Sequence, residues 1–272
     1  MLTLGHIIYS NCFPVHSGIV TNKIQFPFSL VEGIPTELNR MLLEGGLSVS
    51  PSSSIEFAKN PDRYIIMPDF SISSRQKAMS IILKSRVPLD QLKGKTVALT
   101  TASATSVLLL RIILELFYDI HPSYIQFRQG MEDPFEKADA ALFIGDLALQ
   151  TSPTPRHSHL FDLGSLWYDR TGLPFVFALW QVNRKNTLDN DLAVLYDILQ
   201  QSRLYGLSHL NFLAHAYADK FGVPADVLEK YWNSFSFYLG EAEQKGLLAY
   251  YGYAAELGVI KPVKQLNFWM RE

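Results

Sequence analysis

The chain has 272 residues, of which 48% are hydrophobic and 18% charged, and its formal net charge is −2. This length and apolar content suffice for one large domain or two lobes, and they exclude global disorder. Lysine and arginine are spread along the chain without forming a basic face, so we expect no nucleic-acid partner. The apolar runs, such as residues 173–182, are shorter than the ~18–20 residues that a membrane span requires, so we expect no membrane association.

Few residues offer covalent or metal chemistry. The single cysteine, Cys12, has no second cysteine for an internal disulfide, and no sequence motif activates it as a thiolate. The seven histidines are dispersed without HExxH spacing, so we predict no metal site. The start of the chain, MLTLGHIIYSNCFPV, lacks the basic segment and the continuous apolar segment of a secretory signal. We therefore expect a cytoplasmic protein.

Short apolar runs alternate with amphipathic segments through the first two thirds of the chain, which is typical of an α/β fold. Residues 4–10 predict a strand, and residues 35–46 predict a helix that proline opens and paired glycines close. Residues 47–50 alternate like a strand, and a helix is predicted to begin among the serines at 52–54. These serines therefore lie at a strand-to-helix junction.

The same pattern returns in the next part of the chain. Residues 92–100 predict a strand that leads directly into a long apolar helix at 101–120, again through serine and threonine. Further strands are predicted at 80–85, 124–128, 138–146 and 173–182. Two similar α/β halves would place a cleft between two lobes, in which residues 50–54 and 101–106 approach one another.

The character changes from about Asn186 onward. Three helical segments are predicted with no strand between them, at residues 187–207, 211–222 and 225–258. We expect them to form a helical cap. The predicted lobes are residues 1–84 plus 180–272, with the helical part, and residues 85–179.

The two junctions are candidate anion sites. The first turn of a helix leaves backbone N–H groups unpaired and carries the positive end of the helix dipole, and nearby hydroxyls add donors. For any one of these residues, ordinary helix capping is the simpler explanation, but two clusters exceed what capping requires. The hydroxyl side chains are those of Ser52, Ser53, Ser54, Thr101, Ser103, Thr105 and Ser106.

Two further polar residues follow predicted strands, where α/β folds often place ligand contacts. Asn11 is either a residue that shapes a turn or one that binds a ligand, and from spacing alone the turn is the simpler interpretation. Asp146 is either the cap of the next helix or a carboxylate at the cleft, and capping is the simpler interpretation.

Six ordered segments carry a resemblance to one family: GHIIYSNCFPV, GIPTELNRMLLEGGLSVSPSSSIEFAKNPDRY, SISS, GKTVALTTASATSVLLLRIIL, DAALFIGDLAL and DLGSLWYDRTGLPFVFALW. Together, over roughly residues 3–183, the chain resembles the chorismate dehydratases of menaquinone biosynthesis by the futalosine route. The resemblance implies a two-lobed type II periplasmic-binding-protein-like fold with an interlobe cleft.

The resemblance also implies site residues. It places Asn11 in the active site as the catalytic candidate. Its substrate-binding candidates are Ser53, Ser54, Ser103, Thr105 and Ser106, to which we add Asp146 from its position after a predicted strand. The chain departs from the family after SIS, where SRQKAMS places Arg75 and Lys77 near the connection between lobes, so either cation is a further candidate to contact an anionic substrate.

The implied reaction removes water from chorismate, a dicarboxylate, to give 3-[(1-carboxyvinyl)oxy]benzoate. Because the ring becomes aromatic, no metal or organic cofactor is required, and the protein must supply position, charge stabilisation and exclusion of water. Two alternatives remain: a solute-binding protein for a small anion, and the sibling dihydroxynaphthoate synthase, which relies on a histidine that DAALFIGDLAL does not offer. The sequence is also compatible with a homodimer.

Overall fold

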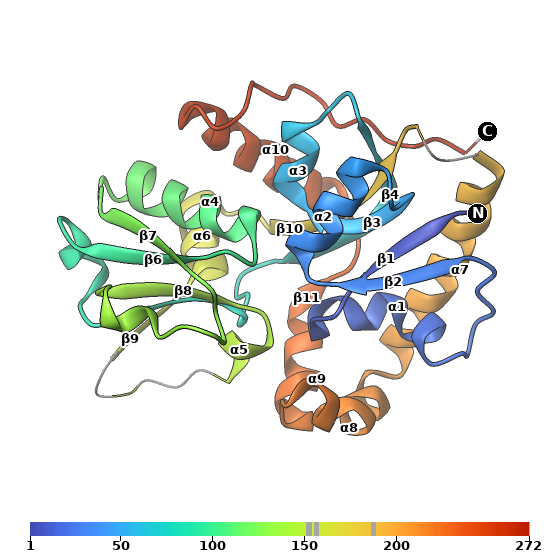
Figure 1. The fold of residues 1–272 in the computed structure, drawn as a ribbon, viewed down its shortest axis with the longest axis horizontal. Coiled ribbons are helices and arrows are strands. Elements are labelled where there is room, and N and C mark those ends of the chain that lie inside the picture. Colours follow the sequence, from blue (N-terminus) through green and yellow to red (C-terminus); the bar gives the residue numbers. More distant parts are fainter. Residues whose placement is uncertain (151–153, 155–157, 186–188, 272) are drawn as a thin grey trace.

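The computed structural model describes residues 1–150, 154, 158–185 and 189–271. Its strands form two separate sheets, which lie at opposite sides of the ribbon in Figure 1 with helices packed around each. This arrangement confirms the predicted α/β class and the two lobes. In the part of the chain that is described, no helix is both long enough and apolar enough to cross a membrane.

The first sheet belongs to the lobe that contains both chain ends. Its strands follow the order β11-β4-β10-β3-β1-β2. The strand β1 runs parallel to β2 and β3, whereas β10 runs antiparallel to β3 and β4. The bounds are β1 Thr3–Ile7, β2 Ser29–Gly33, β3 Val49–Ser53, β4 Tyr64–Ser74, β10 Phe175–Asn183 and β11 Phe235–Ser236.

The second sheet has the order β7-β6-β8-β5-β9. The strand β6 runs parallel to β7 and β8, and β5 runs antiparallel to β8 and β9. The bounds are β5 Ile81–Ser85, β6 Thr96–Thr100, β7 Ser123–Phe127, β8 Ala140–Ile144 and β9 His159–Asp162. Because β6 and β8 are parallel neighbours, their carboxyl ends lie at the same edge of the sheet.

The polypeptide passes between the lobes twice, after β4 and before β10. The predicted lobe boundaries, after residues 84 and 179, would cut β5 and β10. All of β5 pairs within the second sheet, and β10 pairs with β3 and β4 along its length. Because a strand moves with the sheet to which it is hydrogen-bonded, we propose that the lobes divide within residues 75–80 and 172–174.

Helices cover both sheets and carry the C-terminal third. The helices of the first two thirds are α1 Phe13–Val20, α2 Pro35–Glu44, α3 Ser54–Lys59, α4 Ala104–Arg111, α5 Asp146–Leu149 and α6 Leu163–Thr171. Those that follow are α7 Asp189–Ser208, α8 Leu210–Phe221, α9 Ala225–Ser234 and α10 Glu241–Glu256. Short 3-10 turns lie at Ser10–Cys12, Leu89–Leu92 and Pro134–Glu136, and α4 continues into a π-helical turn at Ile112–Phe117.

Both predicted junctions are strand-to-helix turns. The strand β3 ends at Ser53 and α3 begins at Ser54, while β6 ends at Thr100 and α4 begins at Ala104. The helix predicted at 35–46 ends as expected, because Gly45 takes the left-handed conformation with φ 86° that glycine adopts without steric cost. The runs of serine and threonine therefore mark a strand-to-helix turn in each lobe, as predicted.

The helical interpretation of residues 225–258 is wrong in its middle. The chain leaves α9 at Phe235, forms the short strand β11 against Ser73 and Ser74 of β4, and re-enters a helix only after Gly240. Phe237 and Leu239 are buried in this interruption. Pairing with an open sheet edge and burial of two apolar side chains therefore outweigh the local helical preference.

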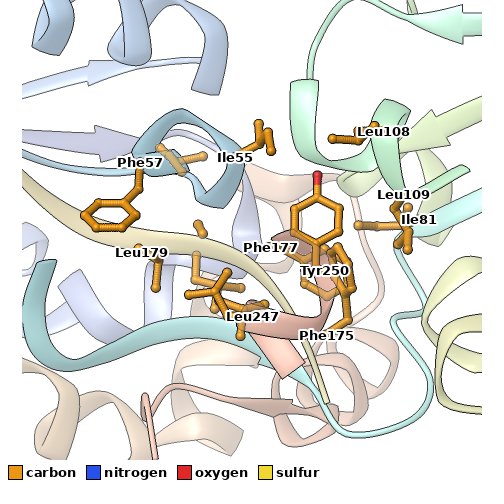
Figure 2. Packing of buried hydrophobic residues seen from close by; sticks show 14 of the residues in the cluster. Ile55, Phe57, Ile81, Leu108, Leu109, Phe175, Phe177, Leu179, Leu247 and Tyr250 are labelled. Carbon is orange, nitrogen blue, oxygen red and sulfur yellow. The ribbon is translucent and has the colours of Figure 1, made fainter. Parts of the chain in front are cut away.

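The helix α10 supports the seam between the lobes. Figure 2 shows Tyr250 of α10 beside Phe175 and Phe177 of β10, with Leu108 and Leu109 of α4 across from them. The Tyr250 hydroxyl donates to the Thr105 carbonyl at 3.2 Å, and that of Tyr251 donates to the Ser54 carbonyl at 2.6 Å. One helix thus holds the backbone of both hydroxyl-rich junctions.

Close packing of α10 against β10 yields a stability prediction. A Cβ atom added at Gly246 would lie 2.0 Å from the Pro174 carbonyl oxygen. We expect Gly246→Ala to lower the free energy of unfolding by about 1–3 kcal/mol, because backbone must shift to admit the methyl group. Gly252→Ala is the matched control on the same helix, where nothing lies within 4 Å of the added atom. Denaturant unfolding measures both, and equal stability of the two variants would contradict this packing.

Candidate functional site

A narrow cavity lies between the lobes, where the strand ends of the two sheets face one another. Its volume is about 40 Å³, which is room for only a few water molecules. The lobes are therefore closed here more tightly than a substrate with several carbon atoms would allow. The lining residues are Ile7, Tyr9, Asn11, Pro35, Ser53, Ser80, Ile81, Ser103, Ser106, Ile144, Gly145, Phe177 and Ala178.

The lining residues are all uncharged. Hydroxyl groups from both lobes, one amide and one phenol provide the polar atoms, and apolar side chains provide the walls. Burial, with the negative charges of Asp146 and Glu37, raises the pKa of Tyr9, so its phenol stays protonated at neutral pH. The cavity can thus donate hydrogen bonds to an anion but presents no strong base.

Asn11 lies where the sequence places it, in the 3-10 turn that follows β1, and it lines the cavity. Its Oδ1 atom is buried and has no hydrogen-bond partner among the described residues. A buried carbonyl oxygen without a partner is costly, and native structures usually satisfy such an atom with water or ligand. In a residue that only shapes a turn, this oxygen would accept a hydrogen bond from a nearby backbone N–H. The ligand-binding interpretation of Asn11 is therefore favoured.

The first junction presents Ser53 to the cavity. Its backbone N–H donates to Asn39 Oδ1 of α2 at 3.2 Å, and its side chain makes no capping bond to α3. Gln181 of β10 donates to the Ser53 carbonyl at 2.9 Å. The backbone of Ser53 is thus fixed on two sides while its hydroxyl is free of a capping role. Ser52 is fully buried and does not line the cavity.

The second junction presents Ser103 and Ser106. The Ser103 Oγ caps α4 by accepting from the Ser106 N–H at 3.2 Å, and the two hydroxyls lie 3.0 Å apart. For Ser103, the capping interpretation is therefore correct, although the residue also lines the cavity. Thr101, which the same hydroxyl cluster includes, is exposed at the start of the turn.

Ser54 and Thr105 join the junctions directly. The Thr105 Oγ1 atom lies 3.5 Å from Ser54 Oγ and accepts from the Ile55 N–H at 3.3 Å. Both side chains are buried beside the cavity rather than lining it. The predicted approach of the two junctions is present, and in this closed state these two residues contact each other.

Asp146 is not the cap of α5, and its carboxylate instead bridges the two lobes beside the cavity. Gly145 occupies the cap position of α5, and the Asp146 carboxylate reaches across to the other lobe, where it accepts from the Ser10 N–H at 3.2 Å and from the Ser10 hydroxyl. Burial raises the pKa of Asp146, and the hydrogen bonds from Ser10 offset part of that rise. The side chain does not line the cavity.

The cations predicted near the connection do not reach the cavity. Arg75 and Lys77 are exposed, and together they line a surface hollow that is distinct from the cavity. The cavity lining also includes Tyr9, Ser80, Gly145 and Phe177, which were not predicted as site residues. Only Gly145 carries a local signal, since it precedes Asp146 at a strand end and adopts φ 65°, a conformation that favours glycine.

A second polar cluster lies buried behind β1. The His6 and His16 Nδ1 atoms are 2.9 Å apart, and Cys12 Sγ lies 3.8 Å from His16 Nδ1. The three side chains have the atoms of a metal site. However, the Trp180 indole can only donate, so His16 Nε2 accepts its N–H at 3.1 Å and neutral His16 carries its proton on Nδ1.

This proton assignment disfavours a metal at the cluster. A metal-binding histidine usually donates its second N–H to an acceptor, whereas Trp180 presents a donor. Burial lowers the pKa of His6 to about 4 and that of His16 well below its usual value, and burial raises the pKa of Cys12 to about 12. The neutral histidines are therefore better explained as a hydrogen-bonded part of the core.

The buried histidines predict acid sensitivity. The unfolded chain takes up protons below pH ~6.5, whereas folded His6 resists protonation down to about 4. The unfolded state thus binds more protons, and the free energy of unfolding falls as pH drops from 6.5 toward 5, by up to ~1.4 kcal/mol per pH unit for each histidine. Urea unfolding at several pH values measures this slope.

Two histidine variants test how the free energy of unfolding depends on pH, one at a buried and one at an exposed position. We expect His6→Gln to flatten the slope, since one of the two buried groups is removed. His215→Gln, on the exposed side of α8, is expected to leave it unchanged. An unaltered slope in His6→Gln would contradict the assignment.

Curated relatives share most of this chain. Chorismate dehydratase of Thermus thermophilus is 33% identical over 262 residues, which cover 91% of this chain and 93% of the relative. The 1,4-dihydroxy-6-naphtoate synthase of the same species is 25% identical and covers 96% of each chain. A chorismate dehydratase of Campylobacter jejuni is 25% identical over 69% of this chain and 70% of its own.

Solved structures confirm the fold. A protein of Archaeoglobus fulgidus matches with a TM-score of 0.76 at 18% identity, over 95% of this chain and 98% of its own. The periplasmic aliphatic sulphonate binding protein of Escherichia coli matches with a TM-score of 0.66 at 15% identity, over 100% and 92%. These likenesses confirm a two-lobed periplasmic-binding-protein-like fold. The sequence pattern of the family described as menaquinone biosynthesis matches residues 2–256, and the chain belongs to that family.

Proposed function

We propose that the protein is a chorismate dehydratase, which removes water from chorismate to give 3-[(1-carboxyvinyl)oxy]benzoate. The relative of Thermus thermophilus that bears this name aligns with 91% of the chain. The observation that carries the proposal is the unpartnered Asn11 Oδ1 inside an uncharged, closed cavity with hydroxyls on both sides. Such a site supplies oriented hydrogen bonds and excludes water, which is what this elimination requires.

With the lobes parted far enough to admit the ring, the cavity would suit a substrate with two separated carboxylates. Ser53 from one lobe and Ser106 from the other offer hydroxyl donors on opposite walls. The helix α4 adds the positive end of its dipole near Ser106. The apolar residues Ile81 and Phe177 would lie against the ring between them. In this arrangement Asn11 accepts a hydrogen bond from the ring hydroxyl and so orients the leaving group.

The proton acceptor is the least obvious part of the reaction. The C–H bond beside the ether oxygen breaks, and its electron pair forms the new ring double bond as the neighbouring C–O bond breaks. The group that accepts the C–H proton must then pass it to the departing hydroxyl, which leaves as water. Tyr9 stays protonated, and the other polar lining groups are hydroxyls and an amide, which are weak bases. We therefore assign the proton to the enolpyruvyl carboxylate of the substrate itself, whose basicity rises in a cavity without cations.

The chemistry sets the cofactor requirement. Atoms balance as one substrate gives one product and one water, and the elimination is redox-neutral. Aromatisation of the ring provides the driving force. The proposal therefore needs no cofactor beyond the protein's own groups.

The role of Asn11 yields a kinetic prediction. We expect Asn11→Ala to lower kcat by about 10²- to 10³-fold, in line with the loss of one oriented hydrogen bond in a catalytic site. Conversion of chorismate to the benzoate product, followed by absorbance and confirmed by mass, measures it. Asn211→Ala, on an exposed position of α8, is the matched control with unchanged kcat. Full turnover in Asn11→Ala would remove the central role of this residue.

The two serine walls yield a binding prediction. Because a hydrogen bond to a charged group contributes ~1.5–3 kcal/mol, we expect Ser53→Ala and Ser106→Ala each to raise the KM for chorismate about 10- to 100-fold. Ser208→Ala, in an exposed position of α7, serves as the control. If both wall variants kept the KM of the unaltered protein, the anion sites would lie elsewhere.

The two alternatives differ from this proposal in what the same assay shows. A solute-binding protein would bind chorismate and release it unchanged. The dihydroxynaphthoate synthase interpretation called for a histidine in the second lobe, and among the described residues none of those that line the cavity is a histidine. Formation of the benzoate product by the purified chain separates dehydration from both.

A further inference from the structure

The contact between Ser10 and Asp146 crosses from one lobe to the other. Ser10 follows β1 in the first lobe, and Asp146 opens α5 in the second. The carboxylate accepts both the N–H and the hydroxyl of Ser10; Ser10 is fully buried and Asp146 is partly buried. No ion pair to Asp146 is present in the described part of the chain, so these hydrogen bonds compensate a partly buried negative charge. Such bonds are strong because one partner is ionised.

The backbone beside Asp146 makes this contact specific. Gly145 adopts φ 65°, and a Cβ atom added to it would meet the Tyr9 ring at 3.4 Å. The Tyr9 ring therefore lies against Gly145, next to the Ser10 contact. The Gly145 N–H donates to the Ser80 carbonyl at 2.9 Å, which ties the start of α5 to the connection between the lobes.

The helix α9 makes two further hydrogen bonds to residues beside this contact. Tyr231 donates to Ser80 Oγ at 2.7 Å, and Trp232 Nε1 donates to the Ser10 carbonyl at 2.8 Å. The Ser10 carbonyl belongs to the peptide bond that leads into Asn11. Ser10 is thus held by its N–H, its hydroxyl and its carbonyl, and the peptide plane before Asn11 is fixed.

We propose that Asp146 is a positioning residue, which holds the Ser10–Asn11 turn in its working orientation only while the lobes are closed. The inference rests on the proposed role of Asn11 in turnover. When the lobes separate, the bonds from Ser10 to Asp146 break while the bond from Trp232, which lies on the first lobe with α8 and β11, is kept. The N–H and the hydroxyl of Ser10 then lose their acceptor, and only the carbonyl remains held. Closure around substrate therefore assembles the site, rather than only covering it.

The decisive variant is Asp146→Asn, which keeps the shape of the side chain and removes its charge. We expect kcat for chorismate to fall about 10- to 100-fold, with KM changed less than about threefold, because the groups that line the cavity are untouched. Asp90→Asn, an exposed residue of the second lobe, is the matched control with unchanged kinetics. A raised KM with unchanged kcat would make Asp146 a substrate contact and overturn the proposal.

Ser10→Ala tests the same contact from the other lobe. It removes the hydroxyl and keeps the backbone donor, so a smaller loss of kcat is expected. In the double variant the losses should not multiply, because both substitutions break one shared interaction. Independent, multiplicative losses would show that Ser10 and Asp146 act separately, and would contradict the proposal.

Backbone hydrogen exchange separates this proposal from the proposed function. In Asp146→Asn, the Ser10 amide should exchange at least about tenfold faster, while amides of β10 keep their rates. This measurement needs no turnover. If the unaltered protein failed to dehydrate chorismate but Ser10 exchange responded to Asp146, the proposed function would fail and the coupling would stand. If exchange did not respond, the coupling itself would be refuted.

Discussion

The structure depends on the contact between its two strand-to-helix junctions. Thr105 of the second lobe lies against Ser54 and Ile55 of the first, and the tyrosines of α10 hold the backbone of both junctions from behind. Polar groups at such a seam must be paired when buried, since each unpaired one is costly. This requirement fixes the position of one lobe relative to the other. The cavity lies beside this contact.

The sequence predicted what local patterns encode. The two junctions, most of the strands and the position of Asn11 follow from apolar periodicity and from the residue types at strand ends. The pattern could not tell which hydroxyl meets a ligand, because Ser53, Ser54 and Ser103 look alike in sequence. Their different roles arise from partners distant in the chain, such as Asn39 for Ser53 and Thr105 for Ser54.

Other features could not be read locally at all. The assignment of Asp146 to Ser10 joins residues 136 positions apart, and the interruption at β11 reflects an open sheet edge that only the fold creates. Tyr9 and Ser80 carry no motif, since their place at the cavity depends on how the second sheet docks. The helices of the C-terminal third were expected to form a cap, and the sequence did not show that they also supply Tyr231, Trp232 and the tyrosines of α10 to the framework of the site.

The uncharged lining has a consequence for release. In the proposed reaction the aromatic product keeps both carboxylates of the substrate. A lysine or arginine that bound the substrate tightly would therefore bind the product equally tightly. Hydroxyls and backbone N–H groups bind an anion less tightly than a cation would. When the lobes part, hydration of the freed carboxylates favours release of the product. A cavity without cations thereby avoids retaining what it has made.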